Sequence, residues 1–346
     1  ACVPGGGGSD CRIDILRDNT TFLLEGLNLR EGASSLMMHR NQAPLDLVTG
    51  APSTNNDWHN LLKWTSVSQG GAQGYEGSGD LEALRLVFNG SLVPEEDLFL
   101  PHVLHRFSTC AAVGSSAGLL QSHAAEVLNE HEVVLRFNNA PVTKYKNAVG
   151  QKTTFQVLNH DAVQEMLRGG TDPELLRARK RKTEPESGKQ AIKLVWRAED
   201  FPHYVSLRRR LPGDTIMLLA PEFLIKTVAM YKTILRRLKE IYPIEGPQVA
   251  PNGFIGIAFL LQTCQTVNVY GFDPPEAVPL SEQNPYRYYD RTKPGDINAL
   301  RAEYLLLRAL HAARFITLCT TEHADRCVAM TPRNANGMIM RSGVKW

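Results

Sequence analysis

Short apolar segments alternate with longer stretches of helical periodicity through the last two thirds of the chain. Strands are predicted over 111–114, 133–136, 154–158, 192–196, 216–219, 267–270 and 315–318. Helices are predicted over 119–129, 221–242, 253–263 and 299–313. The strands are apolar on both faces, which is typical of a parallel sheet covered by helices on two sides. The pattern therefore predicts an α/β fold with a doubly wound, mostly parallel sheet.

The first 105 residues lack a sustained period of either kind. We expect residues 1–105 to form an irregular, partly helical extension that packs on a single α/β domain over 106–330, with 331–346 as a C-terminal tail. Residues 177–182 form a dense positive run followed by turn-forming residues. A solvated loop is the favoured interpretation of that run, over a patch for an anionic ligand or a nuclear-targeting signal.

The composition is that of a folded protein, with 43% apolar and 21% charged residues. The 38 Lys and Arg residues nearly balance the 36 Asp and Glu residues, so the net charge is only +2. This balance argues against a nucleic-acid-binding protein whose affinity depends on a strong positive field. Because the chain has no long uninterrupted apolar run, we expect a soluble fragment, with any signal peptide or membrane anchor lying upstream.

Cysteines and glycosylation sequons bear on the compartment. The 6 cysteines are Cys2, Cys11, Cys110, Cys264, Cys319 and Cys327. They form an even set without a Cys-x-x-Cys pair, which allows three disulfides. Asn19 and Asn89 each begin an Asn-x-Ser/Thr sequon for N-glycosylation. These features favour the secretory pathway, although chance sequons and free buried thiols in a cytosolic enzyme would give the same pattern.

A turn of small residues follows the first predicted strand and precedes a predicted helix. Residues 113–118 have the sequence Val-Gly-Ser-Ser-Ala-Gly. Small side chains let backbone N–H groups approach an anion, and the helix N-terminus adds partial positive charge. The segment matches neither the dinucleotide Gly-x-Gly-x-x-Gly pattern nor a P-loop. Simple packing of the turn is the alternative interpretation.

Four blocks of the chain, in order, carry a family resemblance. Residues 110–118, continuing through 135–141 to 149–154, resemble the long sialylmotif of eukaryotic sialyltransferases. Residues 251–254, continuing through Cys264 to 269–272, resemble the short sialylmotif, and 287–290 and 298–303 are similar to the third and last motifs. The resemblance covers about 110–319. It is greatest to the branch that sialylates galactosides, and a plant-type sialyltransferase-like member is a second identification.

The resemblance implies a nucleotide-binding, Rossmann-type catalytic domain and a function. That function is inverting glycosyl transfer from a CMP-activated, sialic-acid-like donor to the terminal galactose of a glycan, without a metal or other cofactor. It also implies a glycoprotein of the Golgi lumen with type II topology, whose signal-anchor lies upstream. Two alternatives stay open. One is the same fold using CMP-Kdo or UDP-galactose on a plant-type polysaccharide, and the other is an inactive glycan- or nucleotide-binding homologue.

The resemblance also assigns donor-binding positions. They are Ser115, Asn138, Asn159, Asn252, Gly253, Arg287, Tyr288 and Tyr289. Side-chain amides suit such a role because they donate to phosphate oxygens and also recognise ribose or base edges. Without the motif, Asn138 would be interpreted as a turn-capping amide ahead of Pro141.

Disulfide pairings follow from the same resemblance. Cys110 and Cys264 match cysteines that the family joins across the sheet, and Cys319 resembles one that pairs with the amino-terminal extension, where Cys11 is the candidate. Cys2 would then be left to pair with Cys327.

The catalytic assignment departs from the family pattern. Position 298 holds Asn where the last motif has the His that takes the acceptor's proton. A carboxamide cannot act as a general base, although it can orient the hydroxyl. The candidates at the catalytic centre are therefore Asn298, Glu303 and Asp290, with Asp296 and His160 as further possible bases. His311 is assigned to packing or to the surface.

Two further departures lie in the donor-binding motifs. Arg287 stands where the third motif has His or an aromatic residue, and Pro251-Asn252 replaces a Ser/Thr pair.

Overall fold

The computed structural model describes a large part of the chain. The described residues are 36–38, 93, 94, 97, 99, 107–169, 190–247, 249–274, 285–290, 296–319 and 327. Several predictions fall on residues outside this set: the sequons at Asn19 and Asn89, Cys2 and Cys11, the basic run 177–182, and the tail 331–346. The limits of the extension and of the catalytic domain stay predictions.

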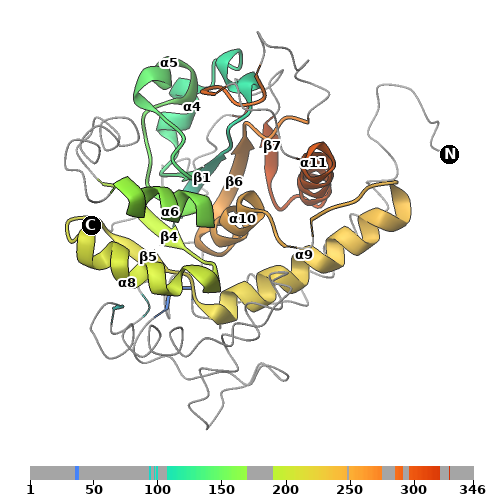
Figure 1. The fold of residues 1–346 in the computed structure, drawn as a ribbon. Coiled ribbons are helices and arrows are strands. Elements are labelled where there is room, and N and C mark those ends of the chain that lie inside the picture. The colour runs from blue at the N-terminus through green and yellow to red at the C-terminus, as the bar shows by residue number, and fades with distance from the viewer. Residues whose placement is uncertain are drawn as a thin grey trace, which may run out of the picture.

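The described residues form a seven-stranded, wholly parallel sheet with the order β5-β4-β3-β2-β1-β6-β7 (Figure 1). The strands are β1 Phe107–Val113, β2 Val133–Phe137, β3 Phe155–Leu158, β4 Ile192–Val195, β5 Ile216–Leu218, β6 Cys264–Tyr270 and β7 Thr317–Cys319. Each strand coincides with one of the seven predicted apolar runs, give or take a few residues at the ends. The predicted α/β fold with a parallel sheet is confirmed.

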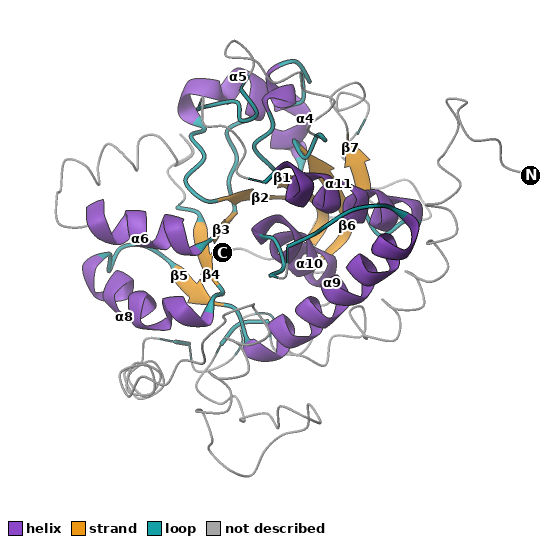
Figure 2. Cartoon of the chain, turned by 45° about the vertical axis from the view of Figure 1, so that its right-hand side comes forward, coloured by secondary structure: helices purple, strands orange, loops and turns teal. Residues whose placement is uncertain are grey.

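Helices cover both faces of the sheet (Figure 2). They are α4 Ala125–Glu130, α5 Lys146–Val149, α6 His160–Gly169, α8 Phe201–Arg210, α9 Pro221–Ile241, α10 Asn252–Thr263 and α11 Ile297–Ala312, with 3-10 turns η1 Ala117–Leu120, η2 Thr143–Tyr145 and η3 Ala198–Asp200. Alternate residues of β1 enter different clusters: Cys110 and Ala112 pack with α9, α10 and α11, whereas Ala111 and Val113 pack with α4. This alternation is the expected consequence of two covered faces.

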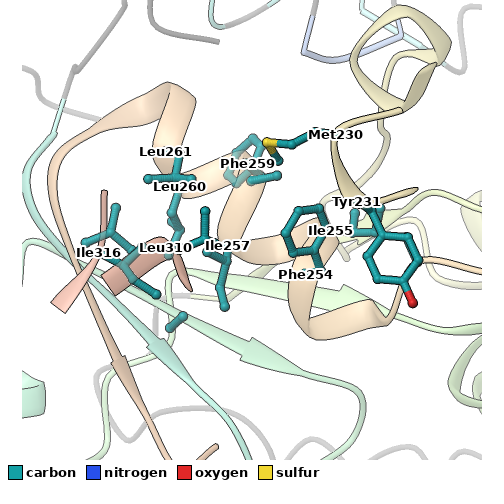
Figure 3. Close-up of a cluster of buried hydrophobic side chains, with 14 of the residues drawn as sticks. Met230, Tyr231, Phe254, Ile255, Ile257, Phe259, Leu260, Leu261, Leu310 and Ile316 are labelled. Carbon is teal, nitrogen blue, oxygen red and sulfur yellow. The ribbon is translucent and has the colours of Figure 1, made fainter. Parts of the chain in front are cut away.

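Helix α10 is the most deeply buried helix of the described fold. Residues Gly253 through Thr263 are all buried. Figure 3 shows its side chains between Met230 and Tyr231 of α9 on one side and Leu310 and Ile316 on the other. A helix that is apolar all round is stable only inside a core. The position of α10 is therefore fixed by packing on every side.

Three of the four predicted helices are confirmed as α9, α10 and α11. The continuous helix predicted over 119–129 is wrong, because η1 and α4 are separate. His123 between them has φ 50°, a left-handed conformation that an α-helix cannot contain. Helices α6 and α8 were not predicted.

Two disulfides join described residues. Cys110 in β1 is bonded to Cys264, which ends α10 and begins β6, and this confirms the predicted bridge. Cys319 is bonded to Cys327. The predicted pairings of Cys319 with Cys11 and of Cys2 with Cys327 are therefore wrong. The sequence separation of Cys319 and Cys327 is only 8, so their loop closes at a small loss of chain entropy.

A hydrogen bond holds the returning chain beside β6. The Tyr270 hydroxyl donates to the Cys327 carbonyl at 2.8 Å. None of the helices among the described residues has both the length and the hydropathy needed to span a membrane.

We expect the bridge between Cys110 and Cys264 to stabilise the fold about twice as much as the bridge between Cys319 and Cys327. Their sequence separations are 154 and 8, for which loop-closure entropy predicts about 5 and about 2.5 kcal/mol. Urea unfolding of the double Ala variant of each pair measures the two losses. An equal or smaller loss for the longer loop would contradict this account.

Candidate active site

The topology brings the carboxyl ends of several strands to one edge of the sheet. After β1 the chain adds β2 to β5 on one side, and then places β6 on the other side of β1. Ligands of doubly wound sheets bind where the strand order reverses in this way, here between β1 and β6. Gly114 and Gly271 follow these strands and approach so closely that a Cβ on Gly114 would collide with the Gly271 carbonyl oxygen.

Three asparagines meet beside this point. Asn138 follows β2, Asn159 follows β3, and Asn252 is the first residue of α10. The Asn138 side-chain oxygen accepts from the Asn159 backbone N–H at 2.9 Å and from Asn252 Nδ2 at 3.1 Å. The structure thus brings together three predicted donor-binding residues that are up to 114 positions apart.

Asn252 holds this network in place, because protein groups use both ends of its amide. Its Nδ2 also donates to the Val157 carbonyl at 3.1 Å, and its Oδ1 accepts from Trp196 Nε1 at 2.7 Å. Trp196 is buried and follows β4. The Asn252 side chain therefore connects α10 to the ends of β2, β3 and β4.

Some hydrogen-bond donors at this edge of the sheet are left for a ligand. Among the described residues, neither the side-chain nitrogen of Asn138 nor that of Asn159 has a hydrogen-bond partner. Helix α10 begins after Pro251 without a side-chain cap, so its first N–H groups remain available. Asn138 has φ 53°, a left-handed conformation that Asn tolerates better than most residues. These groups suit an anion such as a phosphate.

The third motif docks on the turn after β1. The Tyr288 backbone N–H donates to the Ser115 carbonyl at 3.0 Å, and the Ala117 N–H donates to the Tyr286 carbonyl at 2.8 Å. Ser116 forms an antiparallel bridge with Arg287, and its hydroxyl accepts from the Gly118 N–H at 3.2 Å. The predicted donor-binding residues Ser115, Arg287 and Tyr288 thus lie next to each other.

The side chains of the third motif have different environments. Tyr288 is buried, and its hydroxyl donates to the Pro141 carbonyl at 3.0 Å. Arg287 lies 3.3 Å from the Asp290 carboxylate, and the Arg287 side chain is 44% exposed. Burial raises the pKa of Tyr289. Asp290 is therefore one member of an ion pair at the surface.

The last motif begins α11. Asn298 is the second residue of this helix, and Asp296 caps it by accepting from the Ala299 N–H at 3.2 Å. Glu303 lies further along the helix and faces α10, since a Cβ on Gly253 would collide with Glu303 Oε1. Gly253 is therefore required for the close approach of the carboxylate to the start of α10.

Burial changes the acidity of Glu303. It raises the pKa of the carboxyl group from 4.5 to about 7. Burial raises the pKa values of Tyr231 and Tyr286, and the charge of Glu303 raises them further. A carboxyl group with a pKa near neutrality can both accept and donate a proton under physiological conditions.

The two histidines that were considered from the sequence, His160 and His311, contact residues outside the amide network. His160 begins α6, and its Nδ1 lies 2.7 Å from the buried Asp200 carboxylate. His311 is exposed, and its Nδ1 accepts from the Leu318 N–H at 3.3 Å in the turn between α11 and β7.

Trp196 and Asp200 were not identified from the sequence. The available signal was their position, since Trp196 ends a predicted strand and Asp200 follows shortly after it.

The chain is similar in sequence to known proteins. A family model described as glycosyltransferase family 29 (sialyltransferase) matches residues 55–315. Beta-galactoside alpha-2,6-sialyltransferase 2 of Xenopus tropicalis is 32% identical over 174 residues, which cover 49% of this chain and 32% of that protein. The protein of the same name from Homo sapiens is 29% identical over 210 residues, which cover 59% and 38%. The chain spans about a third of the length of these relatives.

The fold also matches solved structures. A crystal structure of a mammalian sialyltransferase in complex with Gal-beta-1-3GalNAc-ortho-nitrophenol aligns with a TM-score of 0.53 at 16% identity. The alignment covers 83% of this chain and 90% of that one. At this identity the match supports the fold alone.

We expect Glu303 to make the stability of the protein depend on pH. Because the folded-state pKa is raised, its contribution is fully present below pH 4.5 and is lost as the pH rises to about 7. The loss reaches up to about 3 kcal/mol relative to Glu303→Gln, which cannot ionise. Urea unfolding of both proteins across this range measures it. Glu126→Gln, on the exposed surface of α4, is the matched control, and parallel curves for wild type and Glu303→Gln would contradict the prediction.

Proposed function

The chain belongs to glycosyltransferase family 29, the sialyltransferases, and we propose that it transfers a sugar from a CMP-activated, sialic-acid-like donor to the terminal galactose of a glycan. The transfer inverts the anomeric centre and needs no metal. The observation that carries the proposal is the meeting of Asn138, Asn159 and the start of α10 at one edge of the sheet. The printed names of the relatives, beta-galactoside sialyltransferases, support the acceptor.

The chemistry of these groups suits a nucleoside monophosphate leaving group. Free amide nitrogens and the uncapped N-terminus of α10 are donors that can receive one phosphate. The sequence contains no Asp-x-Asp motif of the kind that holds a metal-bound diphosphate. These features favour a CMP-linked donor over a UDP-linked one.

The reaction also requires a base. The acceptor hydroxyl oxygen bonds to the anomeric carbon while the bond from that carbon to the phosphate oxygen of CMP breaks, and the hydroxyl proton must leave. Asn298 cannot take this proton. In the proposal Glu303 does so, because its pKa of about 7 leaves a useful fraction ionised at neutral pH.

The compartment is also part of the proposal. Two disulfides among the described residues support an oxidising environment such as the Golgi lumen. There the protein would act as the luminal part of a type II membrane protein.

The absent histidine is the observation that favours two alternatives. In one, the chain lacks transfer activity and serves as a nucleotide- or glycan-binding homologue; in the other, it uses CMP-Kdo or UDP-galactose as donor. Donor binding and transfer assays separate these functions.

We expect the side-chain amide of Asn138 to contribute to CMP binding. Asn138→Gly removes the amide while tolerating φ 53°, and should weaken binding by about 1–3 kcal/mol, or about 5- to 150-fold. Calorimetry with CMP measures the change, and CDP and UDP test the choice of nucleotide. Asn139→Ala is the control, since that neighbour donates to Glu165 instead. Unchanged CMP affinity in folded Asn138→Gly would remove Asn138 from the site.

We expect the unmodified chain to transfer sialic acid slowly, and Asn298→His to increase the rate. A positioned base typically contributes about a hundred- to ten-thousand-fold. Transfer from CMP-sialic acid to a galactoside, followed from about pH 5 to about pH 8, should acquire a titration near the imidazole pKa of about 6.5. Glu303→Gln should remove the slow activity of the unmodified chain.

Two results would contradict this account. The first is that Asn298→His is no faster than the unmodified chain and Glu303→Gln is no slower. The base would then be another residue. Use of another nucleotide sugar in place of CMP-sialic acid would establish the alternative donor.

A further inference from the structure

Two histidines and a buried aspartate meet at the ends of β3 and β4. These strands are parallel neighbours, with Leu158 paired to Val195. His160 begins α6 shortly after β3, whereas Asp200 and His203 lie in η3 and α8 after β4. His160 Nδ1 is 2.7 Å and His203 Nδ1 is 3.3 Å from Asp200 Oδ1. One ligand atom from each residue can be chosen so that all three lie within 4.8 Å of one another.

The environment of Asp200 is a second, independent observation that points to a ligand. The residue is 0% exposed, yet its Oδ2 has no hydrogen-bond partner among the described residues. Leaving a buried carboxylate oxygen unpaired is unfavourable. The two histidines contact only the other oxygen, Oδ1. A cation bound by both oxygens of the carboxylate would supply the partner that Oδ2 lacks.

The donor set identifies the class of cation. Two imidazole nitrogens and one carboxylate oxygen form a set that Zn²⁺ uses with a fourth position left for water. Tetrahedral ligands at about 2.1 Å from zinc are about 3.4 Å apart. The 3.3 Å between His203 Nδ1 and Asp200 Oδ1 matches this spacing, whereas the 2.7 Å between His160 Nδ1 and Asp200 Oδ1 would have to lengthen when the ion binds. Mg²⁺ and Ca²⁺ prefer oxygen ligands only.

The surroundings contain charges of both signs. Glu199 Oε1 lies 3.7 Å from His160 Nδ1, and Arg197 pairs with Glu199 at 2.5 Å. The starts of α6 and α8 carry partial positive charge, which opposes a cation. The carboxylates of Asp200 and Glu199 must offset that charge, so binding should depend strongly on Asp200.

A neighbouring amide can adapt to the metal-bound form. Gln164 Nε2 lies 2.9 Å from His203 Nε2. When His203 binds through Nδ1, its ring proton lies on Nε2, and the Gln164 amide can accept it after rotating to present its oxygen. Such a hydrogen bond fixes the tautomer of a ligating histidine.

We infer that His160, Asp200 and His203 form a Zn²⁺ site that joins the start of α6 to the start of α8 (Figure 1). The site takes no part in the proposed transfer reaction. Its effect is to hold the end of β3 and the start of α6 in position. His160 follows Asn159, whose N–H binds Asn138 and whose side chain caps α6 through the Ala162 N–H. Zinc would therefore stabilise the end of β3 on which the amide network depends.

The test measures metal content and stability, not transfer. The purified chain is dialysed against a chelator and titrated calorimetrically with Zn²⁺, and its melting temperature is recorded with and without the ion. We expect one Zn²⁺ per chain, a melting temperature that rises with Zn²⁺, and no comparable effect of Mg²⁺. Co²⁺ should give the visible absorption of a tetrahedral site.

Variants assign the ion to this cluster. Asp200→Asn and His203→Gln should each weaken Zn²⁺ binding at least about a hundredfold. His123→Asn is the control, because His123 is exposed and has a left-handed φ that Asn tolerates. His160→Gln repeats the test if another variant does not fold. Absence of stoichiometric binding by the unmodified chain, or binding that survives these substitutions, would overturn the inference.

Discussion

The burial of α10 on all sides positions both the sheet and the candidate site. This helix is apolar on every side and is enclosed by the sheet, α9 and α11. Its C-terminal end continues directly into β6 at Cys264, which is covalently bonded to β1. Its N-terminal end is therefore held at a fixed place on the carboxyl edge of the sheet, and the candidate site is built around that end.

Polar groups at the edge are arranged by the same helix. Asn252 projects from its first turn and binds the ends of β2, β3 and β4 through Asn138, Val157 and Trp196. Because these contacts use the whole Asn252 amide, the amide nitrogens of Asn138 and Asn159 are left for a ligand. A residue that the family resemblance places in the donor site thus also organises that site.

The start of α10 also affects the pKa of a carboxyl group on α11, the helix that packs against it. Gly253 has no side chain, so the Glu303 carboxylate of α11 can lie against it. The resulting burial raises the Glu303 pKa to about 7. A chain with Asn298 in place of the usual histidine therefore still holds a titratable group beside the proposed phosphate site. This is the physical basis for proposing transfer instead of binding alone.

The strands and the family could be predicted from the amino-acid sequence alone. Short runs of apolar or β-branched residues predicted every strand, because a strand buried on both faces needs apolar residues along its length. The motifs identified the amides and the bridge between Cys110 and Cys264. Helices α6 and α8 were missed, because short helices on a sheet depend on tertiary packing more than on local preference.

Contacts between side chains that are distant in the sequence could not be predicted in this way, because they depend on how the elements pack. The pairing of Cys319 with Cys327 depends on the path of the chain after β7, and the contact of Glu303 with Gly253 depends on how α11 packs on α10. The cluster of His160, Asp200 and His203 exists because β3 and β4 are neighbours in the sheet. Hydrophobic periodicity specifies which face of a segment is buried, but the partner of that face is chosen by the packing of the whole fold.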